Sequence, residues 1–95
     1  MFINNNNMAK KISQKILKYT AIFEPAEEGG YVVTVPVLPG CATQGETFEE
    51  ATEMIKDAIQ GYLAVLKDEN QEIPEEIEDA VITKVSVPIP ISSYT

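Results

Sequence analysis

The sequence predicts an α+β fold in the order β-β-β-α-β, with one long helix packed on an antiparallel sheet. Three observations predict it: apolar residues recur at period two in the first half, at spacings of three and four over 48–66, and at period two again near residue 85. Because 95 residues suffice for one modest core, we expect a single domain over 16–90. Residues 1–15 are expected to form a frayed or disordered tail, and 91–95 a short C-terminal tail.

A hairpin is predicted for the first two strands. The period-two pattern runs from residue 16 to Pro25, and again over 31–35 until Pro36. The Gly29-Gly30 pair between them allows positive φ in a tight turn. The alternation gives each strand one face of shared residues: Tyr19, Ala21 and Phe23 in the first, and Tyr31, Val33 and Val35 in the second.

A short third strand is expected over 41–43, after a turn at Pro39-Gly40. A helix should then begin at Thr47, which forms a Thr-x-x-Glu capping box with Glu50, and end between residues 67 and 70. Gly61 interrupts it, which we interpret as close packing against the sheet. The helix carries one amphipathic stripe: Phe48, Ala51, Ile55, Ala58, Ile59, Tyr62, Leu63 and Leu66.

The C-terminal part of the domain is predicted to return to the sheet. Residues 68–79 form an acidic connector, and the AVITKVSV run over 80–87 has strand character. Val81, Val85 and Val87 fall on one face of it, and Pro88 ends it.

Composition excludes several chemistries. There is no histidine, so there is no histidine general base and no histidine metal ligand, and the single Cys41 permits neither an internal disulfide nor a cysteine zinc site. No apolar stretch approaches the ~20 residues of a membrane span. We therefore expect a cytoplasmic protein with no metal and no cofactor.

The charge is unevenly distributed. Residues 1–23 hold four lysines and no acid, so they carry +4. Residues 24–95, the body of the chain, hold three lysines and all fifteen acids, so they carry −12 and the net charge is −8. Such an acidic body should not bind phosphate backbones, which attract lysine and arginine. We expect no direct nucleic-acid binding by this chain alone.

Two residue types have competing interpretations. Cys41 lacks a neighbouring histidine that would activate its thiol, so a small buried apolar residue is the favoured interpretation. Tyr31 and Tyr62 could stack on bases, but few lysines accompany them, so we expect half-buried positions in the sheet and the helix.

Several short motifs occur in order between residues 19 and 74. They are Gly29-Gly30-Tyr31, Pro36-Val37-Leu38-Pro39-Gly40-Cys41, Gly45-Glu46-Thr47, Glu49-Glu50-Ala51, Gly61-Tyr62-Leu63 and Ile73-Pro74. In these motifs and their spacing the chain resembles the HicB family of antitoxins, and the ordered set is more specific than any one motif alone.

The resemblance implies a degenerate RNase-H-like fold without a working active site. It also implies an antitoxin that binds and neutralises HicA, a small ribonuclease toxin, by protein-protein contact. Many family members carry a C-terminal DNA-binding domain. In this chain only the seven residues IPISSYT follow Pro88, so we expect a short form that lacks that domain. A homodimer or higher oligomer is expected, formed by strand addition at a free sheet edge.

Candidate partner-binding residues follow from the charge argument. A ribonuclease that grips RNA needs a basic surface, and exposed carboxylates can steer such a partner. The same acids could instead interact with the helix dipole or merely solvate a face. The loop over 36–41 could be a recognition loop or simply the turn that joins two strands. The candidates are Glu46, Glu49, Glu53, Asp57, Leu38 and Pro39.

Two other functions remain open at this level. Clustered carboxylates can hold Mg²⁺, as in RNase-H-like nucleases, and the candidates by type are Glu24, Glu46, Glu49 and Glu50. Alternatively, the chain is a stand-alone oligomeric binding module with a different ligand.

Overall fold

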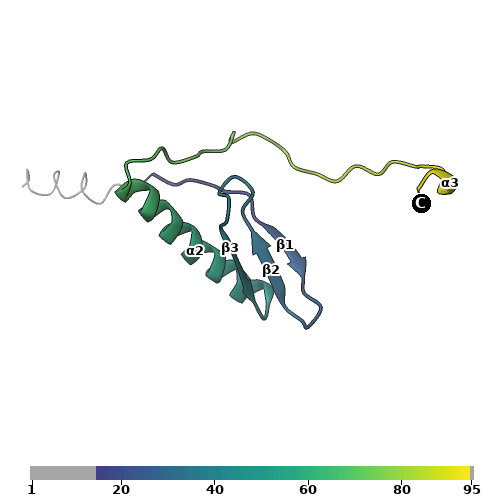
Figure 1. Ribbon diagram of the computed structural model, residues 1–95, viewed down its shortest axis with the longest axis horizontal. Coiled ribbons are helices and arrows are strands. Elements are labelled where there is room, and N and C mark those ends of the chain that lie inside the picture. The colour runs from purple at the N-terminus through teal and green to yellow at the C-terminus, as the bar shows by residue number, and fades with distance from the viewer. Residues whose placement is uncertain (1–14, 95) are drawn as a thin grey trace, which may run out of the picture.

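The computed structural model describes residues 15–94 and shows an antiparallel sheet with one long helix on it (Figure 1). The predicted α+β class is therefore confirmed. The helix α2 packs mainly against β3 and β2, and β1 meets it through the ring of Phe23, which packs on Phe48. The elements are β1 (Ile22–Pro25), β2 (Tyr31–Thr34), β3 (Ala42–Gly45), α2 (Phe48–Asp68) and α3 (Ile91–Tyr94).

The sheet has the strand order β1-β2-β3, and both pairings are antiparallel. The register aligns Phe23 with Val33 and Val33 with Thr43. Gly30 has a φ of +76°, and a Cβ placed on it would lie 2.3 Å from the carbonyl oxygen of Gly45. The hairpin turn therefore requires glycine both for its backbone conformation and for the close approach of β3.

Both ends of α2 are capped, and the cap at its start is the one that the sequence predicts. The Thr47 hydroxyl accepts a hydrogen bond from the Glu50 N–H at 3.0 Å, and the Glu50 carboxylate accepts one from the Glu46 N–H. At the other end, Asn70 adopts a φ of 57° and the Gln71 N–H donates to the Leu66 carbonyl at 2.8 Å. This is the left-handed termination that asparagine tolerates.

The core lies between α2 and the covered face of the sheet. A Cβ on Gly45 would lie 2.7 Å from the Cα of Ala51, so the strand and the helix touch closely at this point. The strand faces and the helix stripe predicted from periodicity supply this core. Its buried members are Val33, Val35, Leu38, Cys41, Ala51 and Ile55, with Tyr19, Ala21, Phe23, Tyr31, Val37, Ala58, Ile59, Tyr62 and Leu63 packed around them.

Two smaller predictions need correction. The first strand begins at Ile22, because residues 15–21 are extended but do not pair with β2. Apart from its chain neighbours and the backbone of its own helix, Gly61 has no atom within 4 Å of the position its Cβ would occupy, and the residue is exposed. The interpretation of Gly61 as a close contact with the sheet is therefore wrong.

The fourth strand predicted over 80–87 does not join the sheet. These residues are extended and unpaired within the described chain, and they continue away from the sheet toward α3 (Figure 1). Val81, Val85 and Val87 are 86%, 78% and 69% exposed. The radius of gyration is accordingly 19.3 Å, compared with about 12 Å for a compact chain of this length.

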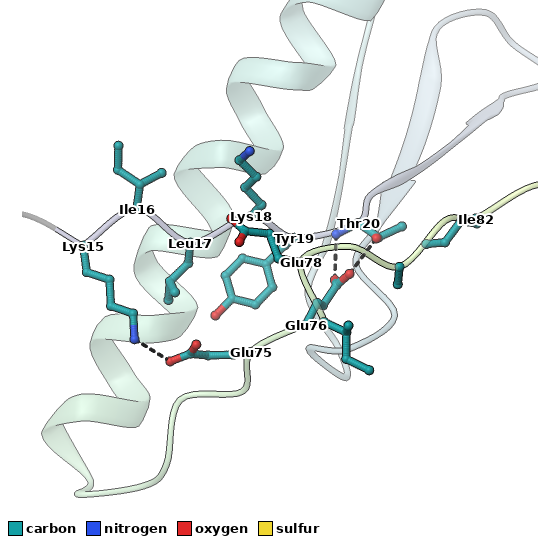
Figure 2. Close-up of a pocket in the computed structure, with 12 residues that line it drawn as sticks. Lys15, Ile16, Leu17, Lys18, Tyr19, Thr20, Glu75, Glu76, Glu78 and Ile82 are labelled. Atoms are coloured by element: carbon teal, nitrogen blue, oxygen red, sulfur yellow. Dashed lines mark hydrogen bonds and ion pairs between the residues drawn. The ribbon is translucent and has the colours of Figure 1, made fainter.

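The path of the connector explains this difference. Residues 74–76 lie beside residues 15–20, and the two segments run in the same direction (Figure 2). The earlier segment then enters β1, while the later one continues outward (Figure 1). Residues 80–87 are thus extended, as their alternating pattern predicts, but they do not pair with the sheet of the same chain. The predicted 1–15 tail falls almost wholly outside the described residues.

Candidate partner-binding surface

An acidic stripe follows the outer side of α2. Glu49, Glu53 and Asp57 are all exposed and are spaced by four residues, which places them on one side of a helix. At 100° per residue they lie roughly opposite the buried Ala51 and Ile55, hence on the side away from the sheet. Like charges at this spacing repel by a few tenths of a kcal/mol, so a cationic partner would relieve a small strain.

Glu46 extends this acidic surface toward the hairpin turn. It lines a shallow hollow together with Glu28 from the turn and Glu50 from the first turn of α2. Glu28 is not among the residues predicted for this surface from the sequence, because its proximity to Glu46 depends on the close approach of the turn to the end of β3. The acidic surface therefore combines two elements: Glu28, Glu46 and Glu50 at one end, and Glu49, Glu53 and Asp57 along the helix.

None of these carboxylates has an ion-pair partner within residues 15–94, where the single pair is Lys15 with Glu75. Unpaired exposed carboxylates keep their full charge available to an approaching cation. Their field at distance is limited only by salt, with a Debye length of about 8 Å at physiological ionic strength. The surface is thus suited to attracting a basic molecule and unsuited to a phosphate backbone.

The loop over residues 36–40 belongs to a different surface. Leu38 is fully buried, so the expectation that its side chain contacts a partner is corrected: it anchors the loop in the core. The Leu38 N–H donates to the Val35 carbonyl at 2.9 Å, and the Cys41 N–H donates to the Leu38 carbonyl at 2.9 Å. Pro39 is exposed, and its carbonyl accepts a hydrogen bond from the Tyr62 hydroxyl at 2.9 Å.

The predicted candidates therefore fall into two groups that the fold does not bring together. Tyr62 lies on the sheet side of α2 with the core residues, so Pro39 lies on that side as well. The acidic stripe lies on the other side. A single flat partner surface would contact one group or the other.

A second polar cluster joins the two extended segments. The carboxylate of Glu76 accepts hydrogen bonds from the backbone N–H and the hydroxyl of Thr20, each at 2.7 Å. The Tyr19 hydroxyl donates to the Pro74 carbonyl, and Lys15 pairs with Glu75 at 2.9 Å (Figure 2). Burial, and then the negative charges of Glu75 and Glu76, raise the pKa of Tyr19. These contacts fix where the C-terminal segment begins.

The buried cysteine and the two tyrosines occupy the positions expected of them. Cys41 is buried in the core, and this burial raises the pKa of its thiol, which disfavours the reactive thiolate. Tyr31 and Tyr62 are half-buried and pack around the core. All three residues are structural in this arrangement.

The carboxylates considered for a magnesium-dependent nuclease form no metal-binding group within the described residues. Among residues 15–94 there is no group of three or more histidine, cysteine, aspartate or glutamate side chains able to hold a metal ion. Glu24 lies on β1, whereas Glu49 and Glu50 lie in the first turn of α2. The described residues also contain no helix long and apolar enough to cross a membrane.

These features define a small acidic α+β domain whose exposed chemistry is that of surface carboxylates. Comparison with protein families matches residues 19–86 to the HicB-like antitoxin of bacterial toxin-antitoxin systems. The match covers more than two thirds of the chain. The chain belongs to the HicB-like antitoxin family, which confirms the resemblance carried by its sequence motifs.

Several relatives are similar over most of the domain. A UPF0150 protein of Thermoplasma acidophilum is 52% identical over 60 residues, which are 63% of this chain and 87% of that protein. A UPF0150 protein of Synechocystis is 39% identical over 74 residues, or 78% of this chain and 91% of the relative. Antitoxin HicB 1 of Photorhabdus laumondii is 43% identical over 60 residues, which are 63% of this chain but 39% of the longer relative.

Proposed function

We propose that this protein is the antitoxin of a type II toxin-antitoxin pair, and that it neutralises a small HicA-like ribonuclease by protein-protein contact. The observation that carries the proposal is the family match over residues 19–86. A relative named as a HicB antitoxin supports the same role. In this proposal the chain acts in the cytoplasm, where the toxin meets its RNA, and has no catalytic activity or cofactor of its own.

The acidic surface supports the choice of a basic partner. A ribonuclease must hold RNA through cationic side chains, since phosphate contacts dominate affinity for nucleic acid. Glu49, Glu53 and Asp57 present three exposed carboxylates along one side of a rigid helix. They are therefore placed to compete with phosphates for the same cationic groups. Such charges mainly raise the association rate, while apolar contacts at the centre of an interface set the lifetime of the complex.

A charge-neutral triple variant tests this role. Glu49→Gln, Glu53→Gln and Asp57→Asn together remove three negative charges from the stripe without changing side-chain size. We expect the association rate with a HicA-like ribonuclease encoded beside this gene to fall about tenfold at low salt, because steering by charge is lost. Stopped-flow or surface plasmon resonance measures that rate at several salt concentrations.

The matched control removes the same three charges elsewhere. Asp68→Asn, Glu72→Gln and Asp79→Asn change exposed residues outside the acidic surface, so they should slow association by threefold or less. Equal effects of both variants would show that net charge alone matters and would refute the assignment of the stripe. Neutralisation is measured separately, as the loss of RNA cleavage when an equimolar amount of this chain is added to the toxin. Undiminished cleavage with a stable complex would refute the antitoxin mechanism itself.

We also propose that the protein acts as a homodimer or higher oligomer. The support is physical: the domain leaves both a sheet edge and a run of apolar side chains uncovered within the described residues. Uncovered apolar surface of this kind usually marks an interface.

A further inference from the structure

The uncovered apolar side chains are concentrated in residues 80–91, here named the C-terminal arm. The arm is extended up to the start of α3, and every residue in it is exposed. Its side chains alternate, so that Val81, Val85 and Val87 share one face while Ile82, Lys84 and Ser86 share the other. The exposed large apolar residues of the arm are Val81, Ile82, Val85, Val87, Ile89 and Ile91.

A strand of this composition is unstable alone in water. Its backbone N–H and C=O groups gain nothing from being extended unless they pair, and its valines gain nothing unless they are buried. Within residues 15–94 no strand pairs with it. The arm therefore has the composition of a buried strand without a sheet to complete.

The same chain also carries a sheet edge without a strand. β1 is an edge strand that pairs only with β2, so its outward-facing backbone groups are unpaired within the described chain. The apolar cluster beside that edge is incompletely covered. Phe23 packs on Phe48 with ring centroids 4.6 Å apart, yet Phe48 remains 52% exposed. On the other face of β1, Ile22 is also exposed.

The arm and the edge of one chain do not pair with each other within the described residues. The bonds from Thr20 to Glu76 fix the C-terminal segment just before β1 begins. Beyond that point the arm runs away from β1 (Figure 1). A second molecule is therefore the source of a complementary surface that this arrangement leaves open.

We propose that the arm is exchanged between two copies of this chain. The arm of one copy adds to the outer edge of β1 in the other, and the second arm makes the same contact in return. The valine face then packs beside Phe23 and Phe48 on the helix side of the sheet. The opposite face brings Lys84 to the side of β1 that carries Ile22 and Glu24.

The area available matches what a stable dimer needs. The six apolar side chains of the arm can each bury on the order of 80 Å², which gives about 1,000 Å² for two arms. The surfaces that they cover contribute a similar amount, so the total reaches the ~1,200–2,000 Å² of a standard interface. Reciprocal exchange also closes the assembly at two copies, because each dimer then has no free arm.

Charge favours the arm as the site of contact. Each copy carries a net −8, so two bodies repel each other when they approach through their acidic surfaces. The arm holds one charged residue, Lys84, which is positive. It therefore reaches a second copy without bringing like charges together, and Lys84 is opposite in sign to Glu24 on β1.

The mass of the isolated full-length chain tests the proposal without any toxin. We expect light scattering after size exclusion to give twice the 10.5 kDa of one chain at micromolar concentration. Val85→Asp should raise the dimer dissociation constant at least tenfold, because the exchange would bury an unpaired carboxylate. Ser86→Asp is the matched control, since it adds the same charge one residue away on the other face, and it should change the constant by less than threefold.

Cross-linking distinguishes exchange from other dimers and does not depend on Val85→Asp folding. Glu24→Cys in one copy and Lys84→Cys in another, carrying a different tag, are co-expressed and treated with a flexible bismaleimide; native Cys41 is buried. The expected product joins the two tags. Three results would overturn the proposal. They are a monomer mass at all concentrations, equal effects of Val85→Asp and Ser86→Asp on the dissociation constant, and cross-links formed only within one chain. An arm that becomes protected from proteolysis only when a toxin is added would also overturn it.

Discussion

Thr20 and Glu76 are joined by two hydrogen bonds although 56 residues separate them in the chain. The Thr20 N–H donates to one carboxylate oxygen of Glu76, and the Thr20 hydroxyl donates to the other, each at 2.7 Å. This pair, together with the Tyr19 contact to Pro74, holds the connector beside the extended segment that precedes β1. The arm begins shortly after this contact, at residue 80.

Loss of that pair should loosen the connector. Glu76→Ala removes both acceptors and leaves the half-buried Thr20 N–H without a partner, so we expect the free energy of unfolding to fall by about 1–2 kcal/mol. Urea denaturation measures the change, and hydrogen exchange should show faster exchange at the Thr20 amide. The control is Glu75→Ala, which removes only the exposed ion pair with Lys15 and should cost about 0.5 kcal/mol or less. Equal losses in the two variants would contradict the importance of the Thr20 contact.

Gly30 and Gly61 should respond oppositely to the same substitution. Gly30→Ala places a Cβ 2.3 Å from the Gly45 carbonyl oxygen at a φ of +76°, so it should destabilise the protein by more than about 2 kcal/mol. Gly61→Ala adds a Cβ that meets no other part of the described chain within 4 Å beyond its own helix backbone, so it should stabilise the helix by about 0.5–1 kcal/mol. Thermal unfolding of both variants gives the comparison. A destabilised Gly61→Ala would mean that a partner approaches the helix there.

The hydroxyl of Tyr62 ties the loop over 36–40 to the helix. Tyr62→Phe removes its hydrogen bond to the Pro39 carbonyl and leaves the ring in place, so we expect a loss of about 0.5–1 kcal/mol. Tyr31→Phe is the control, because the Tyr31 hydroxyl makes no hydrogen bond within residues 15–94 and its ring packs on Phe48 in the same way without it. A loss as large in Tyr31→Phe would show that ring packing, rather than the bond to Pro39, is what both variants disturb.

The free energy of unfolding should decline at alkaline pH because two groups, Cys41 and Tyr19, have raised pKa values in the folded chain. Burial raises the pKa of Cys41 above its ordinary value of 9.0, and burial with nearby carboxylates raises the pKa of Tyr19 above 10.0. The unfolded chain then releases protons at a lower pH than the folded chain, so the free energy of unfolding is unaffected below about pH 8 and falls as pH rises through 9 and 10. Urea titrations at pH 7, 8 and 10 measure this. Cys41→Ala should show a smaller decline, and an identical decline would assign the effect elsewhere.

Much of the fold follows from local pattern. Alternation at period two identifies Tyr31, Val33 and Val35 as one strand face, and that face is the one that the helix covers. The Thr47 and Glu50 pair identifies the start of α2 to the residue, because a capping box is a purely local arrangement. The burial of Cys41 follows from its chemistry and its apolar neighbourhood.

The candidate surface could be predicted only in part. Spacing by four residues suffices to place Glu49, Glu53 and Asp57 on one side of a helix. It does not show that Glu28 lies at the same hollow as Glu46, since that depends on how the hairpin turn meets β3. Nor does it show that Leu38 points into the core while Pro39 points out, because a loop has no period from which to infer direction.

By itself, the sequence determined which segments are extended, which is helical, which face of each is apolar, and that the body is acidic and HicB-like. These properties depend on neighbours a few residues apart. Only the tertiary structure decided that Gly61 is free of contact and that residues 80–87 do not lie beside β1. The physical reason is that a periodic pattern shows that an apolar face must be covered but does not specify which segment covers it. The bonds between Thr20 and Glu76 hold the connector beside the start of β1, yet the arm that follows runs away from the sheet (Figure 1).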